Sequence, residues 1–196
     1  MNRFVCLMIV ATSFATANAQ DNPLAKTAVG DWAKYIVNTV NETVPMMSAK
    51  DKPYWRYAAV VIDGSVRING EYFVGENKAI DGGVIHNIKD RYEPAVGLTN
   101  SKNVKVVSTS KEKVTAGGKQ YDCTKIVRKV DQPVNEETFA ASWIGTSTLW
   151  VSDAVPLGLV KMENAYHMKM TKDDEGMKIK ETWVLAEFGF KNWKGE

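Results

Sequence analysis

The sequence has few of the residues that most often carry enzyme chemistry. It contains two cysteines and two histidines in 196 residues. Cys6 lies in a segment that we expect to be removed on export, so Cys123 is the one thiol of the mature chain and an intramolecular disulfide is excluded. His86 and His167 stand 81 positions apart, so neither belongs to a pair spaced for metal binding. These scarcities argue against thiol, disulfide and zinc chemistry.

The chain also lacks an excess of charge of either sign. Lys and Arg together number 25 and Asp and Glu together number 23, and loss of Arg3 with the leader leaves a balance of +1 (24 against 23). A polyanion-binding protein carries a clear basic excess, so nucleic acid is not an expected partner. After the leader no apolar run approaches the roughly 20 residues of a membrane-spanning helix, so we expect no transmembrane segment in the mature chain.

Catalytic and cofactor-binding motifs are scarce as well. The sequence has no G-x-S-x-G nucleophile motif. The Gly82-Gly83 pair is interpreted as a turn, since it lacks the lysine and the helix start of a phosphate-binding loop. The acidic run 173–175 lacks the alternating ligand loop of a calcium site and is interpreted as a solvated turn. We therefore expect no catalytic residue, no metal site and no cofactor.

Residues 1–19 predict a secretory signal peptide. Arg3 precedes an apolar run from Phe4 to about Phe14, and Ala17 and Ala19 form an A-x-A cleavage pattern. The run is too short to span a membrane, and Cys6 lies too early for lipid attachment at the cleavage point. We expect cleavage near Ala19 and a single β-rich domain over residues 20–196, periplasmic or secreted, with an uncleaved anchor as the alternative.

Turn dipeptides between short alternating segments predict β-hairpins. Asp63-Gly64, Asn69-Gly70 and Gly117-Gly118 each suit the two-residue turns that need positive φ. They separate predicted strands over residues 57–62, 65–68, 71–74, 111–116 and 119–129. In the strand after Gly118, Tyr121 and Cys123 share a face, where Cys123 is interpreted as a small buried hydrophobe.

The C-terminal region shows the clearest alternation. Apolar residues at every second position over 166–170 and 177–185 flank a "KDDEG" turn, which predicts a hairpin with one buried and one solvated face. Glu181 interrupts the apolar face, so a polar partner or a wide opening is expected there. The first strand is expected near residues 32–40.

Eight to ten such strands predict a mainly β fold, a single curved antiparallel sheet (a half-barrel or open barrel) with one or two short helices. One helix is expected over residues 132–144, which fit an irregular excursion equally well, and one helical turn over residues 48–53.

The stretch "STLWVSDAVPLGLVKME" over residues 147–163 predicts a strand, a break and a second strand. Pro156 has no N–H, so ladder pairing should fail there, and Gly158 relieves crowding at a tight bend. We interpret Val155-Pro156 as a corner of the sheet.

The order of a Gly-turn hairpin, "YDC", "LWVSDAVPLGLVKME" and an alternating terminal hairpin is similar to exported bacterial β proteins related to the outer-membrane lipoprotein-sorting carriers (LolA-like). The matching residues are Trp150, Ser152, Pro156, Lys161 and Glu163, within residues 105–187. The resemblance implies a strongly bent half-barrel with a helical plug and an apolar concave face that holds acyl chains.

Aromatic and methionine side chains are abundant, and they suit either a packed core or an adaptable apolar site. We expect an exported non-enzymatic protein that binds a lipid-like or other apolar ligand on the concave face of the sheet. The expected lining residues are Tyr121, Trp150, Met168, Met170 and Trp183. The alternatives are an envelope module with a filled core that binds a protein partner and no small molecule, and a hydrolase that uses one of the histidines.

Overall fold

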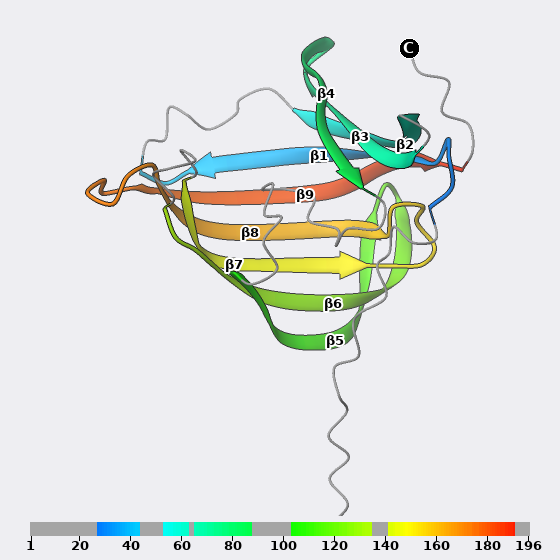
Figure 1. The fold of residues 1–196 in the computed structure, drawn as a ribbon. Helices are drawn as coiled ribbons and strands as arrows, with labels where there is room; N and C mark the ends of the chain where they lie inside the picture. The colour runs from blue at the N-terminus through cyan, green and yellow to red at the C-terminus, as the bar shows by residue number, and fades with distance from the viewer. Residues whose placement is uncertain (1–26, 44–52, 63–64, 88–102, 135–140, 191–196) are drawn as a thin grey trace, which may run out of the picture.

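Nine antiparallel strands make up one continuous sheet in the computed structural model, which describes residues 27–43, 53–62, 65–87, 103–134 and 141–190 (Figure 1). The strand order is β4-β3-β2-β1-β9-β8-β7-β6-β5, so β4 and β5 form its two edges. The strands are β1 Trp32–Asn41, β2 Tyr54–Ile62, β3 Ser65–Val74, β4 Asn77–Asn87, β5 Val104–Ala116, β6 Lys119–Gln132, β7 Ser142–Val151, β8 Leu159–Lys169 and β9 Met177–Gly189. The predicted mainly β fold with a single open sheet is confirmed.

Two predicted hairpin turns join neighbouring strands as expected. Ala116 pairs with Lys119, and between them Gly117 and Gly118 adopt φ values of 54° and 74°. Positive φ at both central residues is what this two-residue turn requires, and glycine reaches it without a steric penalty. The β8–β9 hairpin around the "KDDEG" turn is likewise present, with Met168 opposite Met177.

The prediction of a turn at Asn69-Gly70 is wrong, because both residues lie inside the continuous strand β3. Gly70 pairs with Tyr57 on β2, and a Cβ at Gly70 would lie 2.6 Å from a carbon of the Tyr57 ring. Glycine therefore makes room for an aromatic side chain here instead of reversing the chain.

The turn predicted at Gly82-Gly83 is also wrong, since both residues belong to β4. The pairing of β4 with β3 slips here, with Val84 opposite Gly70 and Ile80 opposite Tyr72. Three residues of β4 therefore face one residue of β3, and glycine is common in such strand irregularities.

The segment at Val155-Pro156 is a hairpin loop between two neighbouring strands, not a corner of the sheet. It joins β7 to β8, and the Ser152 N–H donates to the Gly158 carbonyl across its base. Val155 and Leu157 are buried in the core. Pro156 does end the ladder, as its missing N–H requires, but the chain then turns back.

The described part of the chain contains no α-helix. Of the residues expected in one helix, Gln132 ends β6 and residues 142–144 begin β7, while residues 135–140 and the helical turn expected at 48–52 lie outside the described residues. The helical plug implied by the resemblance is not among the described residues, and none of these residues forms a helix of the length and hydropathy needed to cross a membrane.

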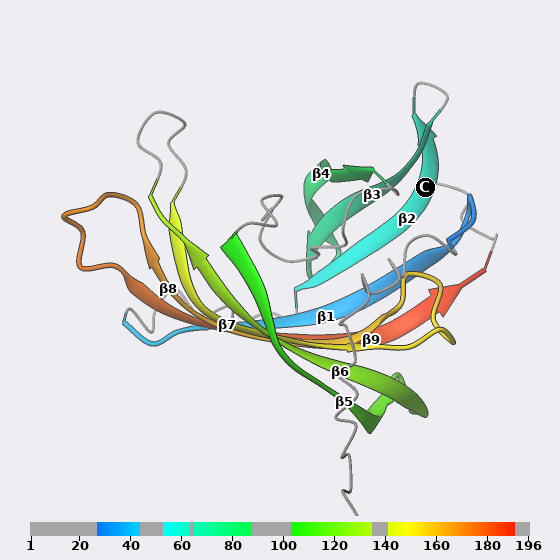
Figure 2. The same cartoon turned by 60° about the horizontal axis from the view of Figure 1, so that its bottom comes forward.

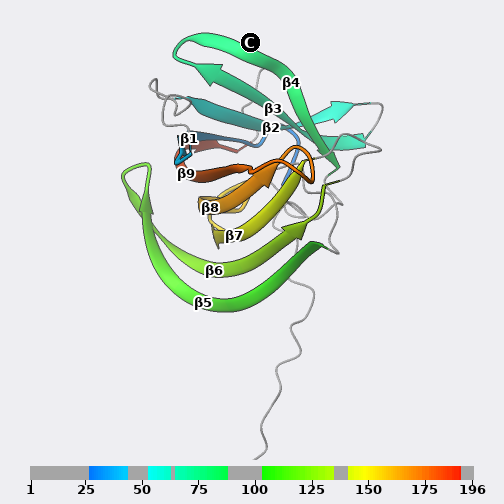
Figure 3. The same ribbon diagram turned by 90° about the vertical axis from the view of Figure 1, so that its left-hand side faces the viewer.

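The sheet curves to both sides of its central strands (Figures 2 and 3). In Figure 2, β2, β3 and β4 rise on one side of β1 and β9, while the β5–β6 hairpin passes on the other side. The hairpin tip reaches β9, because a Cβ at Gly117 would lie 2.6 Å from the Ala186 carbonyl oxygen. We call the side that carries Tyr35 and Trp183 the aromatic face, and the other side the Trp150 face. Most of the buried core lies on the aromatic face.

Candidate functional site on the aromatic face

A cluster of aromatic rings from four strands occupies the aromatic face. Trp183 on β9 is 1% exposed, and its ring centroid lies 6.1 to 6.2 Å from those of Tyr35, Tyr57 and Trp55. Tyr72 on β3 extends the cluster, 5.1 Å from Trp55. Tyr35 and Tyr57 are fully buried, whereas Trp55 and Tyr72 are half-buried. The curvature of β2 and β3 therefore brings rings together while leaving part of the cluster accessible to solvent.

A continuous row of polar side chains crosses five strands beside this cluster. Each member is the register partner of the next, and so the row follows one line across the sheet. This polar row consists of Arg128 (β6), Ser147 (β7), Asn164 (β8), Glu181 (β9) and Thr39 (β1).

Hydrogen bonds link the members of the polar row. Arg128 Nη2 donates to Ser147 Oγ at 2.9 Å. Asn164 Nδ2 donates to Glu181 Oε2 at 3.2 Å, and Thr39 Oγ1 donates to Glu181 Oε1 at 3.4 Å. Of the two alternatives expected at Glu181, a polar partner or a wide opening, the structure shows polar partners.

Apolar side chains flank the polar row on one side. The neighbouring register row is entirely buried and consists of Val37, Trp183, Met162, Leu149 and Ile126. Burying polar groups beside such a row is costly unless they are hydrogen-bonded. The polar row is therefore a specific feature of this face and cannot be attributed to solvent exposure.

Burial raises the pKa of the Glu181 carboxyl, and donors on Trp183, Asn164 and Thr39 oppose that rise. The pKa of Tyr72 is also raised, first by burial and then by the negative charge of Glu181. Tyr72 lies on β3, three strand positions from β9, so the curved sheet brings these groups within electrostatic range.

Two buried polar atoms in this region lack well-aligned hydrogen-bond partners. Asn164 is 3% exposed, and its Oδ1 accepts no hydrogen bond. Trp183 Nε1 makes no hydrogen bond of good geometry, although it lies near enough to the Glu181 carboxyl to favour the charged form. Buried polar atoms are nearly always satisfied, so the unfilled acceptor of Asn164 is an uncommon feature of this face.

A second accessible strip lies farther along the same face. Met177, Met168 and Trp143 follow one another in register, and all three are half-buried. The Trp143 ring packs edge-on against Tyr166, with centroids 5.7 Å apart. Methionine adapts its shape to irregular apolar partners.

The five residues expected to line one ligand site are spread over the molecule. Trp183 and Met168 share the aromatic face but lie far apart on it. Trp183 pairs with Met162, and Met168 lies six residues farther along β8. Trp150 lies on the opposite face, because consecutive residues of a strand alternate and its neighbour Leu149 lies on the aromatic face. Tyr121 is a buried residue of the β5–β6 hairpin itself and packs edge-on against Phe188, while Met170, 56% exposed, lies past the end of β8.

Trp150 has charged neighbours instead of aromatic ones. Lys161 Nζ and Lys125 Nζ lie 4.7 and 5.2 Å from its ring centroid, and Trp150 Nε1 donates to Glu112 Oε2 at 3.1 Å. Hydrogen bonds from Trp150 and Lys125 lower the pKa of the Glu112 carboxyl. This arrangement stabilises a tryptophan beneath a charged surface.

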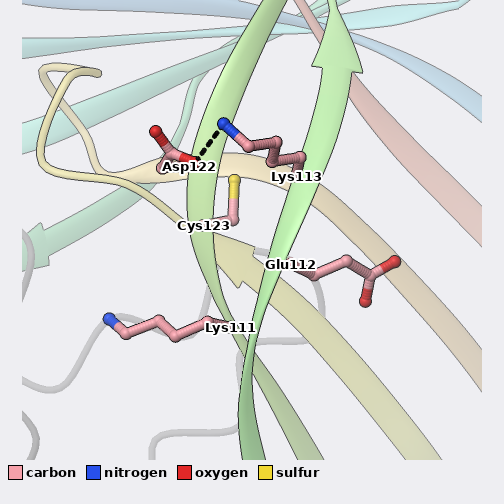
Figure 4. A pocket seen from close by; sticks show the side chains of 5 residues that line it. All are labelled: Lys111, Glu112, Lys113, Asp122 and Cys123. Carbon is pink, nitrogen blue, oxygen red and sulfur yellow. Dashed lines mark ion pairs between the residues drawn. The ribbon is translucent and has the colours of Figure 1, made fainter.

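An open hollow of about 440 Å³ lies at the β5–β6 hairpin, lined by Lys111, Glu112, Lys113, Asp122 and Cys123 (Figure 4). In Figure 4, Lys113 reaches Asp122, while Lys111 and Glu112 point to opposite sides of the hairpin. Burial raises the pKa of the Cys123 thiol to about 11, so the thiol is protonated at neutral pH. The interpretation of Cys123 as a buried hydrophobe is confirmed, and the hollow contains no ready nucleophile.

The other chemical motifs also lack catalytic geometry. Ser108 with Lys111, and Ser110 with Lys113, match S-x-x-K in sequence but lie in β5, where residues three apart face opposite sides. His167 Nε2 contacts the Glu175 carbonyl oxygen at 2.8 Å in the β8–β9 turn. The described residues contain no group of three or more His, Cys, Asp or Glu side chains that could hold a metal.

The sequence interpretation found one member of the polar row, Glu181, and missed the other four. Each of these was detectable as a polar residue at an apolar-face position of an alternating strand, as Asn164 is between Met162 and Tyr166. Their alignment into one row depends on the register of five strands, which alternation within one strand does not fix.

Comparison with known proteins places the chain in no family: no protein-family model and no curated protein sequence matches it. Among solved structures it is similar to a "putative lipoprotein" from Parabacteroides distasonis, with 13% identity, a TM-score of 0.41, and coverage of 83% of this chain and 96% of that one. It is also similar to a "putative exported protein with YmcC-like fold" from Bacteroides fragilis, with 11% identity, a TM-score of 0.39, and coverage of 83% and 97%.

Proposed function

We propose that the protein is an exported, non-enzymatic binding protein that holds a lipid-like or other apolar ligand on the aromatic face of its sheet. The observation that carries this proposal is the strip of half-buried Met177, Met168 and Trp143 on the same face as the buried core. Export rests on the predicted signal peptide over residues 1–19.

The physical basis is the removal of apolar surface from water. Each methylene buried contributes about 0.8 kcal/mol, so a modest contact area suffices to hold an acyl chain. Of the five predicted lining residues, the proposal uses Met168 in the accessible strip and Trp183 as the buried member of the aromatic cluster. The resemblance of residues 105–187 to lipoprotein-sorting carriers points to the same ligand class.

Binding of the neutral fluorescent probe N-phenyl-1-naphthylamine tests the proposal. The wild-type protein is expected to enhance probe fluorescence, and Met168→Lys to weaken binding at least about tenfold, because the lysine charge must be desolvated beside the probe. Met170→Lys is the matched control, since Met170 is 56% exposed two residues away and should leave binding unchanged.

Native mass spectrometry and lipid extraction of the purified protein provide an independent readout. A co-purifying lipid supports the proposal. A wild-type protein that binds neither the probe nor a lipid would contradict it.

The second candidate is an envelope module that recruits a protein partner. It is favoured by β5, a 13-residue edge strand whose Val107 is 62% exposed. An extended peptide could add to this edge by main-chain hydrogen bonding. However, β5 carries three lysines and a register shift between Val106 and Ser108, both of which discourage edge pairing. A stoichiometric protein captured from an envelope extract, without bound lipid, would favour this candidate.

A further inference from the structure

The polar row crosses the aromatic face between apolar regions. A site for a plain hydrocarbon would not need such a row. A buried apolar row lies on one side of it. On the other side lies first the register row of Ile179, Tyr166, Gly145 and Val130, and beyond that row the strip of Met177, Met168 and Trp143. Asn164 and Met168 are four residues apart on β8, a separation of about 13 Å along a strand. A ligand that lies across both features needs a polar end and an apolar end.

The unfilled hydrogen-bonding capacity of the row defines the polar end. Asn164 Oδ1 is a buried acceptor without a donor, whereas the indole nitrogen of Trp183 already acts as a donor toward the Glu181 carboxyl. A hydroxyl group can donate to Asn164 Oδ1. A hydrocarbon would leave this acceptor unsatisfied, whereas a hydroxyl group would fill it.

The charge of Glu181 further narrows the kind of headgroup that the row can bind. An anionic headgroup would lie beside the Glu181 carboxyl and would be repelled by it. An ammonium headgroup would be attracted to the Glu181 carboxyl, but it would have to give up its water on this largely buried row, a cost that pairing with one carboxylate does not ordinarily repay. A neutral headgroup meets neither difficulty.

We propose that the polar row is a headgroup subsite for a neutral, hydroxyl-bearing amphiphile, whose chain lies toward the strip of Met177, Met168 and Trp143. This inference rests on the proposed function and specifies the ligand class of the same face. Asn164 supplies the acceptor for the ligand hydroxyl. Glu181 positions Asn164 by accepting from its Nδ2.

The test is competition against bound N-phenyl-1-naphthylamine by three amphiphiles of equal chain length, each below its micelle concentration: monolauroylglycerol, laurate and dodecylammonium. Monolauroylglycerol is expected to displace the probe with an apparent affinity about tenfold higher than the other two, a difference of the size that one or two hydrogen bonds provide. Equal displacement by all three, or a preference for dodecylammonium or laurate, would overturn the inference.

Substitution locates the effect on the row. Asn164→Leu removes the acceptor with little change in volume, and we expect it to retain probe binding and abolish the preference for monolauroylglycerol. Met168→Leu is the control that alters the strip and keeps the preference. If Asn164→Leu does not fold, Thr39→Val at the far end of the row replaces it, and a preference reduced by that variant supports the inference.

The two proposals fail in different ways. A wild-type protein that does not bind the probe overturns the proposed function and this inference with it. A protein that binds the probe but keeps its preference in Asn164→Leu overturns the headgroup subsite alone.

Discussion

Trp183 and Trp150 are nearly equally buried, at 1% and 5% exposed, but they lie on opposite faces of one sheet and are covered in different ways. Trp183 is surrounded by aromatic rings from β1 and β2. Trp150 is covered by two lysine side chains and bound to Glu112. Both tryptophans belong to the buried core cluster, so the lysines and Glu112 complete the covering of Trp150 on its polar side.

The difference follows from the direction in which the sheet bends at each place. On the aromatic face β2 and β3 curve over β9, so long-range aromatic contacts form. On the Trp150 face the β5–β6 hairpin folds back until its tip at Gly117 meets Ala186. The aromatic face keeps half-buried apolar side chains accessible, whereas the Trp150 face ends in a charged surface. We therefore place the ligand on the aromatic face.

Truncation of Trp183 gives the largest expected effect. Trp183→Ala should lower the free energy of unfolding by about 3–5 kcal/mol, measured by urea denaturation, because it leaves a cavity among four strands. Trp150→Phe sharpens the comparison: it keeps a ring between the lysines, loses the bond to Glu112 and should cost about 1 kcal/mol. Equal losses for both variants would show that the two faces are not packed differently.

Substitutions in the β5–β6 turn should give an intermediate effect. Gly117 and Gly118 both have positive φ, so alanine costs roughly 1–2 kcal/mol at either position. A Cβ at Gly117 also meets the Ala186 carbonyl, whereas nothing lies within 4 Å of a Cβ at Gly118. Gly117→Ala should therefore be more destabilising than Gly118→Ala in urea denaturation, by about 1–3 kcal/mol. Equal effects would contradict docking of the hairpin on β9.

The smallest expected effect is a change in pH dependence caused by Glu181→Gln. Burial raises the pKa of Glu181 above its ordinary 4.5, so the folded state holds this proton more tightly than the unfolded state does. The stability that this group contributes is present below pH 4.5 and is lost as pH rises through the folded-state pKa.

Glu181→Gln should remove that loss. The free energy of unfolding of the variant, relative to that of wild type, should therefore increase from acid to neutral pH when both are measured by urea denaturation. Glu163→Gln is the control on the opposite face, where an exposed ion pair with Lys161 contributes at most about 1 kcal/mol. A pH profile that is the same in Glu181→Gln and wild type would contradict the burial of this carboxyl.

Local sequence predicted most strands but misplaced several glycines. At Gly117-Gly118 the dipeptide forms the predicted turn, whereas Asn69-Gly70 lies within a strand because Gly70 accommodates the Tyr57 ring. The dipeptide is the same kind of signal in both places. Only the position of a ring on the neighbouring strand distinguishes them, and that position is not a local property of the sequence.

The candidate site was predicted less completely than the fold, because it depends on register. Period-two alternation identified Trp183 and Met168 as apolar-face residues, but Tyr121 and Trp150 fulfilled the same local rule on the other face. Alternation says which residues of one strand share a side, and it does not say which sides of two strands coincide.

The sequence alone determined the mainly β fold, the abundance of hairpins and the burial of Cys123, because these follow from alternation and turn chemistry over a few residues. The tertiary structure decided the direction in which the sheet bends, the separation of Trp183 from Trp150 and the polar row from Arg128 to Thr39. The physical reason is that these features depend on the pairing of strands distant in sequence, where each register fixes neighbours that no single strand encodes.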